Sequence, residues 1–299
     1  MAERPLVTVV IPTWNRLPLL RQAVDSVRAQ SWAEWELVIA DDGSTDGTAE
    51  WVRALGDPRV RLVSAPHSGN PGQVRNRGVA AGWGALVAFL DSDDAWLPAK
   101  LELQVGAMLR QGARWCYGGY ELTDAGGNAM PSRTVPFAPL TGRIVREILT
   151  GEANVSIVTV VAERSLLDEV GGFSEDPRAG REDRELELRL ALRADAAAVG
   201  EVVARVREHP GRSTAALADP FERSAAVYDC FLELDPPAEL ARVARRMRAR
   251  QLADAGAHRL AGGEYAAAAR LFARSLPHAP AAGWLRALAR GARGRLRGR

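Results

Sequence analysis

Short apolar runs alternate with amphipathic stretches over the first hundred residues. The apolar runs are rich in β-branched and aliphatic residues, which is typical of strands buried on both faces. They predict strands over 6–12, 35–42, 60–63 and 85–94. Apolar positions at helical spacing, or residues suited to a helix start, predict helices over 18–30, 47–55 and 72–82. This alternation with short connections indicates an α/β fold, with a mostly parallel sheet flanked by helices.

Beyond residue 100 the alternation becomes looser. The pattern predicts helices over 98–111, 163–170 and 181–194, strands over 113–120, 155–162 and 199–208, and a Gly- and Pro-rich loop over 124–142. From about residue 220 the composition shifts to Ala, Arg and Leu at helical spacing, and no strand is predicted there. We therefore expect an α/β domain over 1–215 and an all-helical C-terminal extension over 216–299.

The helical extension contains one segment with a repeat-like pattern. Residues 262–280 (GGEYAAAARLFARSLPHAP) resemble one helix of a tetratricopeptide unit, and residues 239–260 are suited to be its partner helix. Stable arrays need about three such repeats, so one pair is a weak signal. An Ala-rich helical appendage without repeat identity is an equal alternative.

The composition is that of a soluble globular protein, with 47% hydrophobic and 25% charged residues. The net charge of +2 does not distinguish nucleic-acid binding from other functions, and we expect no nucleic-acid partner. Neither the two cysteines nor the four histidines have the spacing of a disulfide framework or a zinc site. The start of the chain lacks the pattern of a secretory signal, and no 18-residue apolar run predicts a membrane span. We therefore expect a cytoplasmic protein.

An acidic run, Asp91-Ser92-Asp93-Asp94, closes the predicted strand 85–94. Three carboxylates this close together are not expected to stay ionised without a cation. Hard divalent ions such as Mg²⁺ and Mn²⁺ prefer oxygen ligands, often shared with substrate phosphates. A diphosphate leaving group needs such an ion to neutralise its developing charge. The alternative is that Asp94 caps the helix that starts near Pro98, which explains one Asp but not three.

A second acidic run, Asp41-Asp42-Gly43-Ser44-Thr45-Asp46, ends the strand over 35–42. Its carboxylates can accept hydrogen bonds from a base N–H or a ribose hydroxyl, and Gly43 permits close backbone approach. The competing interpretation is an ordinary turn, with Asp46 capping the next helix. Because ligands of parallel sheets bind beyond the carboxyl ends of the strands, both acidic runs are expected on one side of the sheet.

A third acidic pair, Glu182-Asp183, follows Arg181 at the start of the helix over 181–194. Acids in a first turn are stabilised by the helix dipole, which is the simplest explanation of the pair. The functional interpretation is a general base that takes a proton from an acceptor hydroxyl. His209, in REHPGRST, follows a predicted strand and is suited to line a site, although an isolated histidine is more often structural.

Taken in order, these segments resemble the inverting glycosyltransferases of family 2, which have the GT-A fold. The resemblance covers roughly residues 5–215. It is carried by VTVVIPTWNR, VIADDGSTDGT, VRNRG, ALVAFLDSDDAWLPAKLELQ and VGGFSEDPRAGREDRELELRLAL. As a set these motifs are highly specific, and none of them is specific alone.

The resemblance implies a role for each matching residue. The donor site is expected to include Pro12, Thr13, Asn15, Arg16, Asp41, Asp42, Arg75, Asp91 and Ser92. Within it, Thr13 and Asp42, with Asp41, contact the nucleoside, and Arg75 approaches the donor phosphates. Asp93 is the expected direct ligand of Mn²⁺ or Mg²⁺, with Asp94 and His209 as further metal-site residues. Asp183 is the expected general base, supported by Glu182.

The implied activity is metal-dependent transfer of a sugar from a nucleotide-diphosphate sugar to an acceptor hydroxyl, with inversion. A UDP-sugar is the default donor. The family often has an aromatic residue soon after its Glu-Asp pair, whereas this chain has Arg184 and Glu187, which leaves the acceptor open among glycans, lipid-linked glycans, peptides and small molecules.

Two other functions compete with this one. A sugar-phosphate nucleotidyltransferase would need a Gly-rich loop after the first strand, and the stretch Pro12–Arg16 contains no Gly. A non-catalytic adaptor would work through its helical C-terminus and would tolerate substitution of both acidic pairs. The C-terminal helices are also candidates for a homodimer contact. Six Arg and no acid between Arg286 and Arg299 suit a peripheral contact with anionic lipid at the inner face of the membrane.

Overall fold

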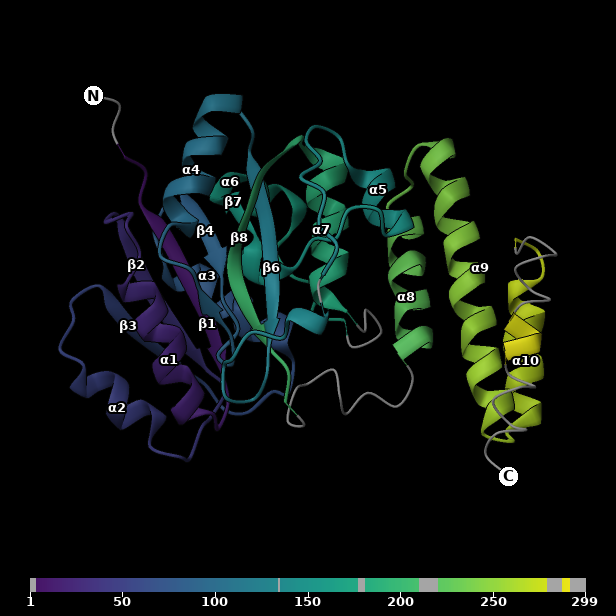
Figure 1. Cartoon of the computed structure of the whole chain (residues 1–299), viewed down its shortest axis with the longest axis horizontal. Helices are drawn as coiled ribbons and strands as arrows, with labels where there is room; N and C mark the ends of the chain where they lie inside the picture. The colour runs from purple at the N-terminus through teal and green to yellow at the C-terminus, as the bar shows by residue number, and fades with distance from the viewer. Residues whose placement is uncertain (1–3, 134, 177–180, 210–219, 279–286, 291–299) are drawn as a thin grey trace. The chain divides into compact units, whose positions relative to one another are not determined.

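The computed structural model of the chain describes residues 4–133, 135–176, 181–209, 220–278 and 287–290 (Figure 1). The chain separates into two compact units. The first comprises Met1–Glu175 and Glu182–Pro210, and the second comprises Asp176–Arg181 and Gly211–Arg299. Each unit is described by itself.

The first unit is built on an eight-stranded sheet with the order β3-β2-β1-β4-β7-β6-β8-β5 (Figure 1). The strands are β1 Val7–Thr13, β2 Trp35–Asp41, β3 Val60–Ser64, β4 Leu86–Phe89, β5 Ala95–Trp96, β6 Trp115–Thr123, β7 Val161–Glu163 and β8 Ala196–Arg207. Of these, β7 and β5 are antiparallel to their neighbours, and the other strands share one direction. The expected α/β fold with a mostly parallel sheet is thus confirmed.

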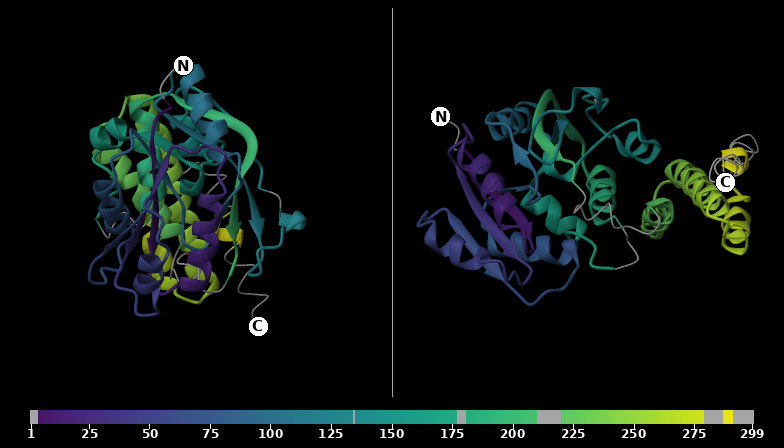
Figure 2. Two further views of the ribbon diagram at one scale, coloured as in Figure 1. Left: turned by 90° about the vertical axis from the view of Figure 1, so that its left-hand side faces the viewer. Right: turned by 60° about the horizontal axis from the view of Figure 1, so that its bottom comes forward.

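Helices cover both faces of this sheet (Figures 1 and 2). They are α1 Leu17–Arg28, α2 Thr48–Ala54, α3 Pro71–Ala81, α4 Lys100–Gln111, α5 Val145–Thr150, α6 Arg164–Val170 and α7 Glu182–Arg193, with short 3₁₀ turns η1 Pro131–Arg133 and η2 Ile157–Thr159. On one face, the Gln30 side chain just after α1 accepts a hydrogen bond from the Leu101 backbone of α4. On the other, α3 lies directly on the sheet, since a Cβ at Gly78 would come within 2.4 Å of Val10 Cγ1.

The register of the central strands brings their carboxyl ends to one edge. Thr13 of β1 lies opposite Asp41 of β2, and Val10 of β1 lies opposite Phe89 of β4. The side chains of these strands are almost completely buried, which explains their continuous apolar runs. Consequently, the turn after β1 and the two acidic runs, which follow β2 and β4, leave the sheet side by side.

The prediction of a strand over 155–162 is wrong over most of that range. Residues Ile157–Thr159 form the 3₁₀ turn η2, and only Val161–Glu163 pair in the sheet as β7. The Ser156 carbonyl accepts hydrogen bonds from both the backbone N–H and the hydroxyl of Thr159, each at 2.8 Å. The Val158 carbonyl accepts from Trp96 Nε1, and the Thr159 carbonyl accepts from Gln104 Nε2. Because these bonds replace a strand ladder, the β-branched composition of the segment does not decide its conformation.

In the second unit, the described residues form α8 Pro220–Glu233, α9 Ala238–Ala261, α10 Tyr265–Ser275 and a helical turn at 287–290. Small residues let α9 and α10 approach closely, and a Cβ at Gly256 would lie 3.1 Å from the Phe272 ring. The expectation of helices without strands therefore holds for the part of this unit that the structure covers. Its assignment to a tetratricopeptide unit stays a prediction. Among the described helices of the chain, none is long and apolar enough to cross a membrane.

Candidate active site

Three carboxylates cluster in the turn after β4. One oxygen from each of Asp91, Asp93 and Asp94 lies within 4.8 Å of the others. Ser92, Asp93 and Asp94 are buried, and Asp91 is partly exposed. An all-oxygen cluster of this size fits a hard divalent cation such as Mg²⁺ or Mn²⁺.

Asp93 is held by two basic side chains from distant parts of the chain. Its Oδ2 accepts a hydrogen bond from Arg16 Nη1 at 2.5 Å and lies 3.0 Å from His209 Nε2. The structure thus brings Arg16 and His209 to the acidic cluster. Their expected roles toward donor and metal stay predictions.

Asp94 and the backbone of Asp93 are held by Arg207, at the end of β8. The Arg207 backbone N–H donates to Asp94 Oδ1 at 2.8 Å, and its Nε donates to the Asp93 carbonyl at 3.1 Å. Helix α4 begins only at Lys100, with no side-chain cap, so the interpretation of Asp94 as a helix cap is wrong. Sequence reasoning missed Arg207, and its only signal was its place two residues before His209.

Arg75 connects the acidic cluster to the Glu-Asp pair of α7. Its Nη2 donates to Asp91 Oδ1 at 2.7 Å and its Nη1 donates to Glu182 Oε1 at 2.8 Å. The guanidinium is buried, and 5.3 Å separates its Cζ from the ring centroid of Phe173. Burial alone would lower the pKa of Arg75, but attraction from Asp91 and Glu182 outweighs it, and the pKa is raised. Together, Arg16 and Arg75 supply part of the positive charge that balances the three carboxylates of the acidic cluster.

Glu182 and Asp183 form the first turn of α7. While Glu182 pairs with Arg75, Asp183 Oδ1 accepts a hydrogen bond from the Arg184 backbone N–H at 2.7 Å. Arg184 Nη1 in turn lies 3.1 Å from Oε2 of the buried Glu187. The two positions at which the family often has an aromatic residue thus hold an ion pair beside the expected base.

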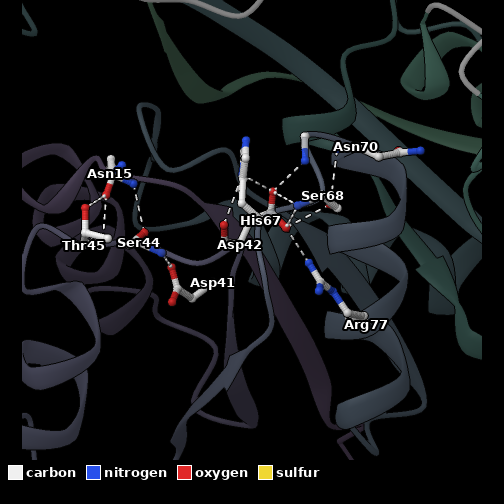
Figure 3. Close-up of polar contacts among 10 residues, drawn as sticks. Asn15, Asp41, Asp42, Ser44, Thr45, His67, Ser68, Asn70 and Arg77 are labelled. Atoms are coloured by element: carbon white, nitrogen blue, oxygen red, sulfur yellow. Dashed lines mark hydrogen bonds and ion pairs between the residues drawn. The ribbon is translucent and has the colours of Figure 1, made fainter.

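Asp42 organises the loop that follows β3 (Figure 3). Its carboxylate accepts hydrogen bonds from the Ser68 and Gly69 backbone, the Ser68 hydroxyl and Arg77 Nη2. His67 Nδ1 lies 2.8 Å from the same carboxylate. Burial would raise the pKa of Asp42, but the backbone bonds from Ser68 and Gly69 and the bond from Arg77 outweigh it, and the pKa is lowered.

Asn15 joins the turn after β1 to the acidic run over 41–46 (Figure 3). Its Oδ1 accepts from the Thr45 N–H at 2.7 Å, and its own N–H donates to Ser44 Oγ at 2.9 Å. Asn15 has a φ of 50°, a left-handed conformation that Asn tolerates better than most residues. Asp41 Oδ1 accepts from the Ser44 N–H, which closes the turn.

The acidic run over 41–46 is thereby a tight turn at the carboxyl end of β2. Gly43 has a φ of 80°, and a Cβ there would come within 2.9 Å of the His67 backbone nitrogen. Asp46 accepts from the Thr48 and Leu17 N–H groups, so it joins the starts of α1 and α2.

Two further expected donor residues lie in β1. Pro12 is opposite Ala40 in the register, and the Thr13 hydroxyl oxygen is buried without a hydrogen-bond partner among the described residues. Nucleoside contacts by Thr13, Asp41 and Asp42 stay predictions.

An aromatic pair beside the turn over 41–46 was not anticipated from the sequence. The Trp14 and His67 rings stack, with centroids 4.1 Å apart and an interplanar angle of 15°. Trp14 is 48% exposed, which is unusual for a large aromatic side chain. The stacking depends on a loop contact between residues 53 positions apart, for which the sequence gives no signal.

The sequence is similar to those of known bacterial proteins. The chain is 32% identical over 163 residues to the UDP-Glc:alpha-D-GlcNAc-diphosphoundecaprenol beta-1,3-glucosyltransferase WfgD of Escherichia coli, a match that covers 54% of this chain and 62% of WfgD. It is 39% identical over 101 residues to the succinoglycan biosynthesis protein ExoO of Rhizobium meliloti, covering 34% of this chain and 29% of ExoO. The chain thus spans less than two thirds of either relative.

Solved structures share the fold at low sequence identity. S. aureus TarS 1-349 in complex with UDP-GlcNAc has a TM-score of 0.67 at 18% identity, covering 97% of this chain and 89% of TarS 1-349. The mannosyltransferase PcManGT from Pyrobaculum calidifontis, in complex with GDP-Man and Mn²⁺, has a TM-score of 0.61 at 20% identity, covering 97% of this chain and 80% of PcManGT. These similarities support the GT-A fold expected from the sequence.

The family model for glycosyl transferase family 2 matches residues 8–171, more than half of the chain. That range contains the strand ends, both acidic runs and Arg75. On this match, the chain belongs to glycosyl transferase family 2.

Proposed function

We propose that this protein transfers a sugar from a nucleotide-diphosphate sugar, with UDP as the expected nucleotide, to an acceptor hydroxyl, with inversion and with the help of a divalent cation. The observation that carries the proposal is the link through Arg75. Its guanidinium pairs with Asp91 of the acidic cluster and with Glu182, the neighbour of Asp183. This link supports a single site that contains both a donor-holding cluster and a potential base.

The acidic cluster would hold the cation through Asp93, with Asp91, Asp94 and His209 as neighbours. A bound cation would neutralise charge on the leaving diphosphate. The turn after β1 and the Asp42 network would hold the nucleoside, because both lie beside the cluster at the strand ends.

Asp183 would accept the proton of the acceptor hydroxyl, and the hydroxyl oxygen would attack the anomeric carbon. The nucleoside diphosphate leaves with the electrons of the broken bond, and a single displacement inverts the configuration. Glu182, held by Arg75, would fix the first turn of α7 and thus the position of Asp183.

For the acceptor, we propose a lipid-linked glycan. The support is the name of the relative WfgD, a glucosyltransferase that acts on a GlcNAc-diphosphoundecaprenol. A lipid-linked acceptor would place the working enzyme at a membrane surface, in peripheral contact.

Replacement of Asp183 tests the mechanism. Asp183→Asn is expected to bind the nucleotide sugar as the wild type does and to lose about 10²–10⁴-fold in the rate of transfer, the usual cost of removing a general base. Asp195→Asn is a matched control, since its side chain is 64% exposed and pairs with Arg143 at the far end of α7. Donor affinity is measured by calorimetry and transfer by product chromatography. Transfer by Asp183→Asn at the wild-type rate would overturn the assignment of the base.

A further inference from the structure

Arg16 occupies one oxygen of the carboxylate that is expected to bind the cation. Its Nη1 lies 2.5 Å from Asp93 Oδ2, and His209 Nε2 lies 3.0 Å from the same oxygen. The Asp93 side chain is only 9% exposed, so there is little room for further partners. A divalent cation binds a carboxylate oxygen at about 2.1 Å and would meet the positive charge of the guanidinium at once.

The side chains of Arg16 and Asp93 differ in how far they are exposed to solvent. The Asp93 carbonyl is fixed by Arg207, which anchors the acidic turn to the end of β8. The Arg16 backbone is fixed as well, because its carbonyl accepts from the Leu19 and Leu20 N–H groups at the start of α1. The Arg16 side chain, however, is 25% exposed and long. Of the two groups in the contact, the guanidinium is the more exposed.

A diphosphate is a suitable new partner for this side chain. The planar guanidinium presents paired N–H donors that match phosphate oxygens, and it keeps its charge at any working pH.

We propose that Arg16 couples cation binding to donor binding. In the free protein it neutralises Asp93, and when a nucleotide diphosphate binds, Arg16 moves to the diphosphate and releases Asp93 Oδ2 to the cation. The proposal rests on the proposed function, since it takes a nucleotide diphosphate as the ligand. It requires that each ligand raises the affinity for the other by the same factor. The cation alone binds weakly, because it must displace Arg16 without compensation.

Titration with Mn²⁺, followed by the electron paramagnetic resonance signal of the free ion, tests this coupling. Wild type, Arg16→Gln and Arg16→Lys are compared with and without UDP, and circular dichroism verifies their folding. Arg28→Gln is the matched control, because it removes the same charge from the other end of α1, where Arg28 pairs with Asp57.

Without UDP, Arg16→Gln is expected to bind Mn²⁺ about tenfold more tightly than wild type or Arg28→Gln. With UDP, after correction for the Mn²⁺ that UDP binds without protein, the Mn²⁺ affinity rises in both proteins because the diphosphate adds oxygen ligands. The rise is expected to be about tenfold larger in wild type than in Arg16→Gln, because only wild type has Arg16 to release from Asp93. Arg16→Lys keeps the charge and stays near wild type without UDP.

Equal Mn²⁺ affinity of wild type and Arg16→Gln, with UDP binding intact, would overturn the role of Arg16 and leave the proposed function standing. Failure of the wild type to bind UDP would instead count against the proposed function. The comparison without UDP would still decide whether Arg16 and the cation compete for Asp93.

Discussion

Arg75 of α3 and Glu182 of α7, 107 residues apart, form a 2.8 Å ion pair next to the acidic cluster. The Arg75 side chain is 6% exposed, and its second partner is Asp91. Sequence resemblance suggested that Arg75 approaches the donor phosphates. In the structure its two terminal nitrogens are engaged by carboxylates, which indicates a role in joining the two halves of the site.

Replacement of Arg75 distinguishes these roles. Arg75→Gln removes the guanidinium that Asp91 and Glu182 share. Removing one partner of a buried ion pair costs about 3 kcal/mol of stability. If Arg75 joins the two halves, transfer falls while donor affinity, measured by calorimetry, stays near that of wild type. A large loss of donor affinity would favour the phosphate contact instead.

The loss of stability is measured by urea unfolding, with Arg205→Gln as the control variant. Arg205→Gln removes an exposed pair with Glu121 on the same sheet. It is expected to cost less than about 1 kcal/mol, as surface ion pairs usually do. Equal losses for the two variants would mean that burial of the Arg75 pairs contributes nothing.

The Asp42 network predicts a dependence of stability on acid. Because hydrogen bonds hold the pKa of Asp42 below its ordinary value, its contribution is fully present above pH 4 and is lost as pH falls through the lowered pKa. Asp42→Asn should cost about 2 kcal/mol at pH 7, and the gap to wild type should narrow below pH 4. Urea unfolding at pH 3 to 7 measures the gap, and a gap that does not vary with pH would refute the account.

Lys100, the only lysine of the chain, is buried in the core of the first unit. Its Nζ donates to Gln104 Oε1 at 2.6 Å and lies 4.2 Å from the centroid of the Trp96 ring. Burial lowers the pKa of Lys100 to about 7, against an opposing influence of the Cys116 thiol. Between pH 7 and 10 the unfolded chain therefore binds a proton that the folded chain lacks, so this side chain makes stability rise with pH.

Lys100→Met isolates that effect, because it removes the only lysine of the chain and leaves the other titratable groups in place. Wild type is expected to gain stability relative to Lys100→Met from pH 7 to 10, by up to about 1.4 kcal/mol per pH unit. Denaturant midpoints at pH 7, 8 and 9 measure the difference. A constant difference would show that Lys100 keeps its proton when folded.

The parts of the fold that depend on local pattern could be predicted, and those that depend on distant contacts could not. The strands β1, β2 and β4 are buried on both faces, so their apolar runs identify them directly. The segment 155–162 has the same composition, but the side chains of Trp96 and Gln104 take its carbonyls. Propensity alone carries no information about such bonds.

The same limit applies to the site. Acidic runs at strand ends predicted where the carboxylates would gather, because parallel strands share one carboxyl edge. The partners of those carboxylates come from elsewhere in the chain. Arg207 holds a turn more than a hundred residues away, and in its strand it has the pattern of an ordinary polar position.

Release of UDP from a panel of UDP-sugars, with Mn²⁺ or with EDTA, tests the central claim most directly, because it needs no knowledge of the acceptor. Wild type with Mn²⁺ is expected to cleave at least one donor slowly. EDTA, or the substitution Asp93→Asn, should reduce the rate by about 10²-fold or more, the usual cost of losing a group that stabilises developing charge. Equal cleavage by wild type and Asp93→Asn, or full cleavage in EDTA, would contradict a cation-dependent glycosyltransferase centred on the acidic cluster.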